Sequence, residues 1–413
     1  MKKLCVSLLC TLLLLASCAP KMNEDEVVQK KNEQANQEKS IVPSYQLSEE
    51  TYKMILPYKT SAARGVITNQ MGNRLDIDEM EEGLRRHSKS VYDPKKYYFQ
   101  EGQYLKEDMV YKWLGRSLTK EQLNEAAKDK VKSLELGKGR KASKDEIEEV
   151  KQDLQLGLNP QLADDDEYSE EANRKNPTYL SHILEQDYLK KKEDNSAELV
   201  GISIGLALKS EYRFQKKKDG PYYYEKISEK RMLEHGKEMA KTVLERIRKI
   251  DGLQNVPVMI GLYREEGQGS PVPGNYVAKT VVNGGESAID DWEAIKEDYV
   301  LFPNEQSAEK YFDDNKLVED FGKEIQQFFP NYVGVIGEGF YINKDLKKLT
   351  LEIPIEFYGK GEVIGFTQYA YGLIKEMFPK YYDLEVKVTA NNETESLIYR
   401  SAGVDDPTVH IFH

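Results

Sequence analysis

The sequence predicts an α+β fold: a mixed, partly helical N-terminal lobe followed by two similar β-β-α-β-β repeats with mainly antiparallel sheets. Two observations indicate the repeats. Strand-like and helix-like hydrophobic periods follow one another in the order strand, strand, helix, strand, strand, and this order occurs twice after residue 195. Each set also opens with a Val-Gly pair, Val200-Gly201 or Val333-Gly334, that leads into a strand containing glycine. A third observation, a pair of capped helices before residue 160, indicates the N-terminal lobe.

The first 17 residues have the plan of a secretory signal peptide. Lysines at positions 2 and 3 form a basic start, a leucine-rich run follows from Leu4 to Leu15, and small residues close the segment. The apolar run is too short to span a bilayer comfortably. Cysteine follows directly, and the four residues Leu15-Ala16-Ser17-Cys18 resemble the bacterial lipobox. The resemblance implies a cut between Ser17 and Cys18 and a diacylglycerol on the Cys18 thiol.

A lipid on Cys18 would anchor the protein to the extracytoplasmic face of the cell membrane, because two acyl chains hold far better than one. Residues 18–44 are mostly polar and predict a flexible tether between this anchor and the body. The other two cysteines, Cys5 and Cys10, lie in the segment that is removed. We therefore expect a mature body without a disulfide, a thiol nucleophile or a cysteine metal site.

Charge and hydropathy narrow the classes of partner. The formal net charge of −12 argues against binding to nucleic acid, because proteins that bind it carry basic patches. The same charge argues against the body itself lying on an anionic membrane, so the lipid has to provide the attachment. No later apolar run approaches the length of a transmembrane helix.

The N-terminal lobe, residues 45–195, is expected to contain loops, short elements and three helices. Thr119 and Gln122 form a capping-box pattern at the start of the first helix. Ser143 starts the second helix, which carries carboxylates in its first turn, where the helix dipole favours them. The third helix is predicted over Tyr179–Lys191, where three apolar residues would share one face.

The two repeats are predicted over residues 196–300 and 301–413. In the first, strands over 197–214 and 222–227 precede a helix over 228–250 and strands over 256–263 and 275–282. In the second, a helix over 308–329 leads to strands over 331–342 and 349–359, a helix over 363–378, and strands over 384–390 and 395–400. Apolar residues recur at three- and four-residue steps in the helices and alternate in the strands.

Four segments of the lobe, together with the lipobox, resemble the CamS-type sex pheromone lipoproteins of Gram-positive bacteria. The segments are Met54–Gly65, Asn73–Leu84, Asp93–Leu105 and Asn176–Leu189. The resemblance covers nearly the whole chain, and the family is likewise described as having two repeats. None of the segments is a chemical motif by itself, but together they are specific.

In this family the named activity belongs to the signal peptide. A short hydrophobic peptide ending at the lipobox is trimmed out, released, and sensed by plasmid-bearing neighbours that respond by conjugation. The resemblance implies such a peptide here, with Thr11–Ser17, or a form without the last serine, as the candidate. It also implies that the lipoprotein processing enzymes are partners. The family's best-known peptide begins Ala-Ile-Phe, whereas this run of leucines has no aromatic ring for a receptor pocket shaped to hold one.

A search for catalytic and metal-binding patterns yields no site. The five histidines lie at positions 87, 182, 235, 410 and 413, without the spacing of metal ligands. Asp164–Glu167 lacks the alternating spacing of a calcium loop and is predicted to be a solvated acidic loop. The glycines from Gly334 to Gly339 do not have the order of a dinucleotide loop and are predicted to allow close backbone packing. The sequence thus predicts no cofactor, no metal and no catalytic residue.

Two features are candidates for a ligand surface. Lys59 and Arg64 place two cations on a loop of small residues. Tyr222, Tyr223 and Tyr224 form a cluster that offers stacking area and hydroxyl groups, a combination that suits a peptide or a glycan. The alternative is that tyrosine, present 27 times, is a half-buried sheet residue in this protein.

These observations predict a membrane-anchored, non-enzymatic envelope protein whose signal peptide is a pheromone precursor and whose body binds a peptide or glycan. Two alternatives stay open at this point. One is a cell-wall hydrolase that uses a pair of carboxylates across a groove. The other is an envelope scaffold that uses the repeats as a docking platform, for which a large exposed apolar patch would speak.

Overall fold

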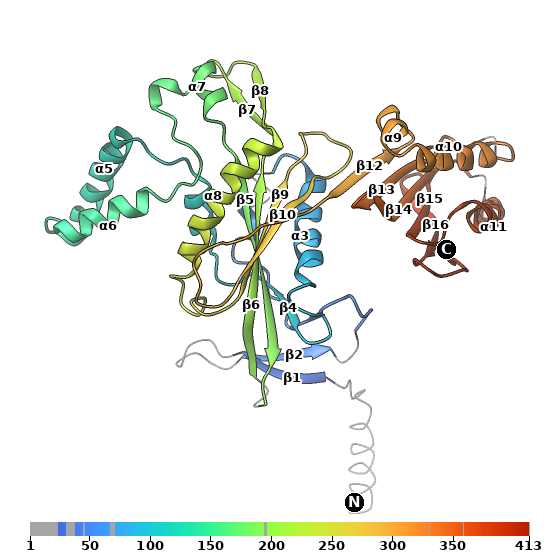
Figure 1. Cartoon of the computed structure of the whole chain (residues 1–413), viewed down its shortest axis with the longest axis horizontal. Coiled ribbons are helices and arrows are strands. Elements are labelled where there is room, and N and C mark those ends of the chain that lie inside the picture. The colour runs from blue at the N-terminus through green and yellow to red at the C-terminus, as the bar shows by residue number, and fades with distance from the viewer. Residues whose placement is uncertain are drawn as a thin grey trace, which may run out of the picture.

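The computed structural model describes residues 24–29, 38–43, 46–66, 71–193, 196–329, 331–357 and 359–412. These residues form two units, a larger one up to β11 (Glu293–Ala294) and a smaller C-terminal one from β12 (Glu297–Phe302) onward (Figure 1). The larger unit is built on a nine-stranded sheet and the smaller one on a six-stranded sheet. A separate two-stranded sheet, β7 (Glu211–Gln215) with β8 (Tyr222–Lys226), projects from the larger unit.

The nine-stranded sheet has the order β11-β10-β9-β6-β5-β4-β3, and the pair β1 and β2 joins it through β6. Its strands before β11 are β1 (Glu24–Gln29), β2 (Glu38–Pro43), β3 (Lys53–Met54), β4 (Tyr98–Glu101), β5 (Leu180–Lys191), β6 (Ser196–Leu208), β9 (Val258–Arg264) and β10 (Asn275–Val282). The helix α3 (Arg74–Ser88) covers one face and α8 (Glu229–Ile247) the other (Figure 1). Met80 of α3 belongs to one core cluster with Met259, whereas Leu244 of α8 belongs to another with Ile260. Burial on both faces explains the continuous apolar runs of β6 and β9.

The C-terminal sheet has the order β12-β13-β14-β15-β16-β17. Its strands after β12 are β13 (Ile336–Ile342), β14 (Asp345–Pro354), β15 (Asp383–Ala390), β16 (Glu393–Arg400) and β17 (Thr408–Ile411). The short α9 (Glu305–Lys310) leads into α10 (Phe312–Gln326), and α10 and α11 (Lys360–Met377) pack on the sheet. Phe321, Leu351 and Phe366 lie in one core cluster of this unit, which is separate from the clusters of the larger unit.

Both sheets contain a four-strand path with the same connectivity. In the larger unit β5 and β6 are antiparallel, α8 crosses over, β9 returns parallel to β6, and β10 is antiparallel to β9. In the C-terminal unit β13, β14, α11, β15 and β16 have the same arrangement, with β14 parallel to β15. The prediction of mainly antiparallel sheets therefore omits a parallel pair in each path, which a helical crossover between neighbouring strands requires.

The helices with strong local start signals are confirmed. α5 (Lys120–Lys138) and α6 (Lys144–Leu154) both begin with complete capping boxes, Thr119 with Gln122 and Ser143 with Glu146. They pack on each other as a hairpin that extends away from the sheet (Figure 1). α8, α11 and the strands that follow them also lie where the sequence predicts them. α4 (Glu107–Leu114) and α7 (Glu170–Lys175) are additional short helices of the lobe.

The predicted helix over Tyr179–Lys191 is wrong, because residues 180–191 form β5 and pair with β4 and β6. The apolar residues follow a helical spacing only because polar side chains, among them Ser181, His182 and Glu185, occupy buried strand positions. As a result β5 is the first strand of the first four-strand path. Residues 222–227, which were predicted to form the second strand of the first repeat, instead contribute β8 to the projecting hairpin.

Two other predicted elements are divided. Residues 197–214 are split between β6 and β7, and residues 308–329 between α9 and α10, which meet at Tyr311. The predicted boundary between the lobe and the first repeat, at residue 195, falls between β5 and β6, inside one sheet.

Part of the predicted tether, residues 18–44, is also strand, since β1 and β2 pair antiparallel there. Val42 at the end of β2 is buried in one cluster with Ile55 and Leu189, a packing that anchors β2 to the sheet. The signal peptide, with Ser17 and Cys18, lies outside the described residues. Within the ranges that the structure describes, none of the helices is both long and apolar enough to cross a membrane.

Buried charges join the two units. Nη2 of Arg86, on α3, lies 2.5 Å from Oε1 of Glu79 and 3.1 Å from Oε1 of Glu297, on β12. The Tyr299 hydroxyl donates to Oε2 of Glu79 at 2.6 Å, and the Arg86 guanidinium lies 4.5 Å from the centre of the Phe340 ring. These five residues, here called the Arg86 cluster, tie a helix of the larger unit to the sheet of the smaller one.

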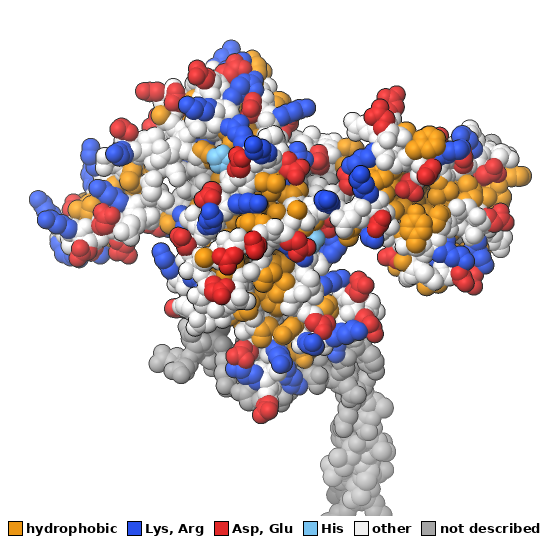
Figure 2. Space-filling model, in the orientation of Figure 1, with side chains coloured by type: hydrophobic (Ala, Val, Ile, Leu, Met, Phe, Trp, Pro, Cys, Tyr) orange, Lys and Arg blue, Asp and Glu red, His pale blue; other side chains and the backbone are white. Residues whose placement is uncertain are grey.

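Over both units, charged side chains of both signs cover the visible face, and hydrophobic ones gather on part of the C-terminal unit (Figure 2).

Candidate functional site

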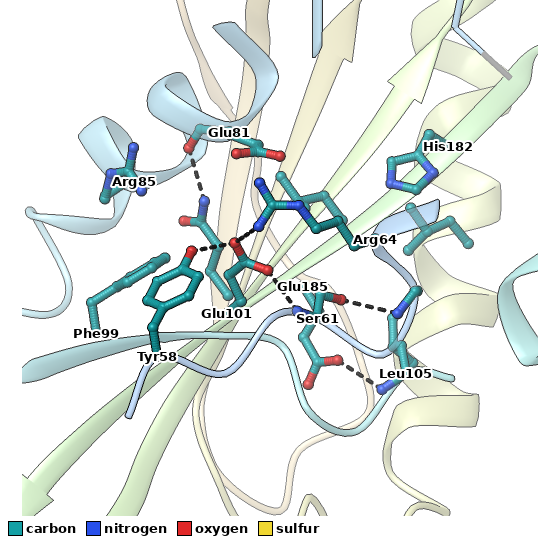
Figure 3. A pocket seen from close by; sticks show the side chains of 14 residues that line it. Tyr58, Ser61, Arg64, Glu81, Arg85, Phe99, Glu101, Leu105, His182 and Glu185 are labelled. Atoms are coloured by element: carbon teal, nitrogen blue, oxygen red, sulfur yellow. Dashed lines mark hydrogen bonds and ion pairs between the residues drawn. The ribbon is translucent and has the colours of Figure 1, made fainter. Parts of the chain in front are cut away.

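A small cavity of about 40 Å³ with a mixed polar and apolar lining, here called the Arg64 pocket, lies where the loop before α3 meets α3, β4 and β5 (Figure 3). The loop contributes Tyr58, Ser61, Ala63 and Arg64, α3 contributes Glu81 and Arg85, β4 and the turn after it contribute Phe99, Glu101 and Leu105, and β5 contributes His182, Ile183, Leu184, Glu185 and Gln186. Segments far apart in the sequence thus meet at one place because β4 pairs with β5 in the sheet.

Glu101, at the end of β4, holds the loop against the sheet. Its carboxylate accepts hydrogen bonds from Arg64 Nη1 at 2.5 Å, from the Ser61 backbone N–H at 2.5 Å, and from the Tyr58 hydroxyl. Burial and the neighbouring Glu101 raise the pKa of the Tyr58 hydroxyl, which therefore stays a donor. The Arg64 side chain remains half exposed, so its cation is fixed at the entrance and still reaches solvent.

The wall formed by α3 carries a second carboxylate and a second cation. Burial raises the pKa of Glu81, while Glu101 raises it further and Arg64 and Arg85 lower it. Along the described chain, the Glu81 carboxylate has no hydrogen bond, whereas its backbone carbonyl accepts one from Gln186 Nε2 at 2.8 Å. The Arg85 guanidinium lies 5.1 Å from the centre of the Phe99 ring. Glu81 is therefore the carboxylate of this wall that is open to a ligand.

The floor is the polar part of β5. The Glu185 carboxylate accepts hydrogen bonds from the backbone N–H groups of Leu105 at 2.7 Å and Tyr104 at 3.2 Å, and Asp187 accepts one from Gln103 at 3.1 Å. Burial raises the pKa of both groups, and the neighbouring Glu185 raises that of Asp187 further. A proton on either carboxyl group removes one charge from this buried site.

Gly102 permits this close approach of the turn to β5. A Cβ atom at this position would lie 2.4 Å from the Cβ atom of Glu185, a distance that no side chain could occupy without displacing the strand. The absence of a side chain at Gly102 lets the backbone N–H groups after it reach the buried carboxyl groups.

His182 completes the floor and is neutral. Its side chain is 2% exposed, and Nδ1 finds no hydrogen-bond partner among the residues that the structure describes. Burial lowers the pKa of His182 to about 3, so the imidazole carries no charge at neutral pH. A buried ring nitrogen without a partner costs free energy, and a ligand group could satisfy it.

The carboxyl groups of the pocket differ in how firmly they are held. Three donors hold Glu101 and two backbone N–H groups hold Glu185, whereas the Glu81 carboxylate accepts no hydrogen bond along the described chain. In the described parts of the chain, no group of three or more His, Cys, Asp or Glu side chains could hold a metal ion. The pocket offers a carboxylate, cations and a neutral imidazole to a small polar group.

The predicted ligand residues do not lie together. Arg64 lines the pocket, whereas Lys59, on the same loop, does not. The tyrosine cluster lies on β8, where Arg213 is 4.2 Å from the ring centre of Tyr222 and Lys216 is 4.0 Å from that of Tyr223. The structure thus separates the two predicted surfaces.

Several residues of the pocket were not predicted as a site: Glu81, Glu101, His182 and Glu185. His182 and Glu185 could be found from one signal in the sequence: polar residues that interrupt an apolar segment which lies next to other strand-forming segments. Of the other predicted features, Asp164 is part of a short 3₁₀ turn (Asp164–Asp166) and accepts a hydrogen bond from Gln122. A Cβ atom at Gly339 would lie 2.7 Å from the Phe302 ring, in agreement with close packing.

Comparisons with known proteins give one consistent result. The family model described as "CamS sex pheromone cAM373 precursor" matches residues 58–406. A solved structure of the C-terminal domain of the sex pheromone staph-cAM373 precursor from Staphylococcus aureus is 28% identical, with a TM-score of 0.68 over 83% of this chain and 98% of that one. A sex pheromone precursor from Lactobacillus salivarius subsp. salivarius UCC118 is 29% identical, with a TM-score of 0.74 over 90% of this chain and 98% of that one. No curated protein matches the chain.

Proposed function

The chain belongs to the CamS sex pheromone cAM373 precursor family, and from this premise we propose that it has two products. One is a short hydrophobic peptide, Thr11–Ser17, cut from the signal peptide. The other is a non-enzymatic body, held on the extracytoplasmic face of the membrane by a lipid on Cys18, that binds a ligand at the cell envelope. The observation that carries the proposal is the family match from residue 58 to residue 406, with the lipobox-like segment in front of it.

The anchor and the peptide rest on the same cut. Diacylation of Cys18 and cleavage after Ser17 by the lipoprotein processing enzymes would leave the body on the membrane and release the segment that contains Thr11–Ser17. Without the thiol the acyl chains have no attachment point, so both products depend on one residue.

We expect mass spectrometry of the native producer to find a mature protein that begins at diacylated Cys18, and a peptide ending at Ala16 or Ser17 in the medium. Cys18→Ala should abolish both, and Cys10→Ala, in the removed segment, should abolish neither. An anchored protein without the free peptide would refute the pheromone product alone. An unlipidated or uncleaved N-terminus in the unchanged protein would refute the anchor as well.

For the body, we propose that the Arg64 pocket holds the free amino terminus of a peptide. A cavity needs a volume of roughly 10–15 Å³ to hold one water molecule. The Arg64 pocket, at about 40 Å³, therefore has room for about three non-hydrogen atoms. That is too little for a sugar ring and enough for an ammonium group with the first carbons of a chain. Glu101 is held by Arg64, whereas Arg64 and Arg85 act on Glu81 only through their charges, so the oxygens of Glu81 are open to the N–H groups of an ammonium ion. Capture of a terminal amine is a known mode of peptide recognition.

Titration of the full-length chain in detergent with L-alanyl-L-alanine tests this role. We expect saturable binding of this dipeptide and of its carboxyl amide, and binding at least about tenfold weaker for the N-acetylated form, because hydrogen bonds between charged groups contribute most to such a contact. Glu81→Gln should weaken binding of the free amine to a similar degree. Lys59→Ala, a cation on the same loop outside the pocket lining, should leave it unchanged. Equal binding of the acetylated dipeptide, or no binding of any form, would refute the proposal.

We further propose that the two four-strand paths are copies of one β-β-α-β-β unit. The support is their common connectivity, with an antiparallel pair, a helical crossover, a parallel partner and a second antiparallel pair in each. In this interpretation the β7–β8 hairpin is an insertion in the first copy, placed between its second strand and its helix.

A further inference from the structure

A second and larger cavity, of about 300 Å³, lies outside the carboxyl ends of β6 and β9. These two strands are parallel neighbours, with Leu208 opposite Arg264 at their ends, so the segments that follow them emerge side by side. The edge formed by the carboxyl ends of parallel strands is a common position for ligand sites in sheets with helical crossovers. The volume also falls at the lower end of the range for small-molecule sites. We call this cavity the β6–β9 cavity.

The β6–β9 cavity has a buried polar floor. Glu265, directly after β9, is 4% exposed, and its carboxyl group accepts a hydrogen bond from the Ser181 hydroxyl. Lys209 Nζ, directly after β6, lies 3.8 Å from Glu265 Oε2. Burial raises the pKa of Glu265 to about 7, which the charge of Lys209 partly opposes. This group can therefore both accept and donate hydrogen bonds near neutral pH.

One wall of the cavity is aromatic, and the rest of the lining is polar with both signs of charge. The Tyr224 side chain is 46% exposed and lines the cavity from the projecting hairpin. Arg213 Nη1 donates to Gln268 Oε1 at 3.2 Å, which places a guanidinium and an amide side by side. The cations Lys209 and Arg213 offset the acidic residues of the lining, so the cavity does not select strongly for a charged ligand.

We propose that the β6–β9 cavity binds a neutral sugar residue of an oligosaccharide, with the sugar ring against Tyr224 and its hydroxyl groups on Glu265, Lys209 and Gln268. A sugar hydroxyl both donates and accepts hydrogen bonds, so it matches a lining that mixes acids, cations and an amide. The C–H face of a sugar ring is apolar and packs on an aromatic ring such as that of Tyr224. This site is separate from the Arg64 pocket, so either binding function can hold without the other.

Binding of maltotetraose and of chitotetraose, two neutral oligosaccharides, to the full-length chain in detergent tests the proposal, with a tetramer of galacturonic acid as the charged comparison. We expect saturable binding of at least one neutral probe and weaker binding of the acidic one. Tyr224→Ala should weaken that binding by about fivefold or more. Tyr223→Ala removes a tyrosine of the same hairpin that lies outside the cavity lining and whose ring lies near Phe214 and Lys216, also outside it, so it should leave binding unchanged.

Three results would overturn the inference: no binding of either neutral probe, equal or tighter binding of the acidic tetramer, or equal losses for the two tyrosine variants. The last result would mean that sugars touch the hairpin surface without entering the cavity. If Tyr224→Ala lowers the melting temperature, Gln268→Ala replaces it as the deciding variant. Retained binding in that variant would equally overturn the proposed position of the sugar.

Discussion

Replacing Arg86 with alanine is expected to lower the free energy of unfolding of the larger unit by about 3–5 kcal/mol. The guanidinium lies between the carboxylates of Glu79 and Glu297, at 2.5 Å and 3.1 Å, and the side chains of these two residues are 7% and 0% exposed. Without the cation, two nearly buried carboxylates remain close together. The variant also loses the contact of the guanidinium with the Phe340 ring.

Urea denaturation followed by tryptophan fluorescence measures this effect, because Trp113 and Trp292 both precede β12 and so report on the larger unit. Arg74→Ala is the matched control: Arg74 lies on the same helix, α3, and its ion pair with Asp78, at 3.9 Å, is on the exposed surface. The control should leave the denaturation midpoint unchanged, because exposed ion pairs contribute little to stability. A loss below about 1 kcal/mol for Arg86→Ala would mean that solvent reaches the Arg86 cluster and that the two units are not held by it.

The sequence predicts best those elements whose signals are local. The starts of α5 and α6 are defined by a side chain and a residue three positions later, Thr119 with Gln122 and Ser143 with Glu146, and both capping boxes form. The strands β14 and β15 alternate apolar and polar residues because one face of the C-terminal sheet is buried and the other is not.

β5 could not be predicted in this way because its environment is not local. The Glu185 carboxylate accepts hydrogen bonds from backbone N–H groups about 80 residues away, at Tyr104 and Leu105, and the Ser181 hydroxyl donates to Glu265. A prediction from sequence assumes that buried positions hold apolar residues. When buried positions of a central strand hold polar residues, the spacing of the remaining apolar residues matches a helix better than a strand. The segment is a strand because it pairs with β4 and β6 in the folded sheet.

The same reasoning applies to the candidate site. Arg64 was predicted as a ligand residue from its loop alone, but its partner Glu101 lies 37 residues later and is brought to it by the pairing of β4 with β3 and β5. Glu81, on the wall of the same pocket, lies on α3 and has no signal in the sequence that separates it from other helix carboxylates. Such residues can be found only when the positions of the strands are known.

Glu265→Gln is expected to raise stability at alkaline pH relative to the unchanged protein, and the gain should grow by about 3 kcal/mol between about pH 4.5 and pH 8. Burial raises the pKa of Glu265 to about 7, from 4.5 for an exposed glutamate. In the folded protein the group therefore keeps its proton over a range where the unfolded chain has lost it. Its contribution to stability is fully present below the pKa of the unfolded chain and is lost as the pH rises through the folded value.

Glutamine has no proton to lose, so the variant lacks this loss, and its side chain can still bond with Ser181. Other groups titrate in the same range: burial lowers the pKa of His182 to about 3 and raises that of Asp76 to about 6. Those groups are present in both proteins, so comparing the free energies of unfolding of variant and parent at each pH removes most of their effect. A difference that does not change with pH would mean that Glu265 is ionised in the folded protein at neutral pH. A carboxylate that stays charged on the floor of the β6–β9 cavity would favour a cationic ligand there over a neutral sugar, so this titration also bears on what the cavity can bind.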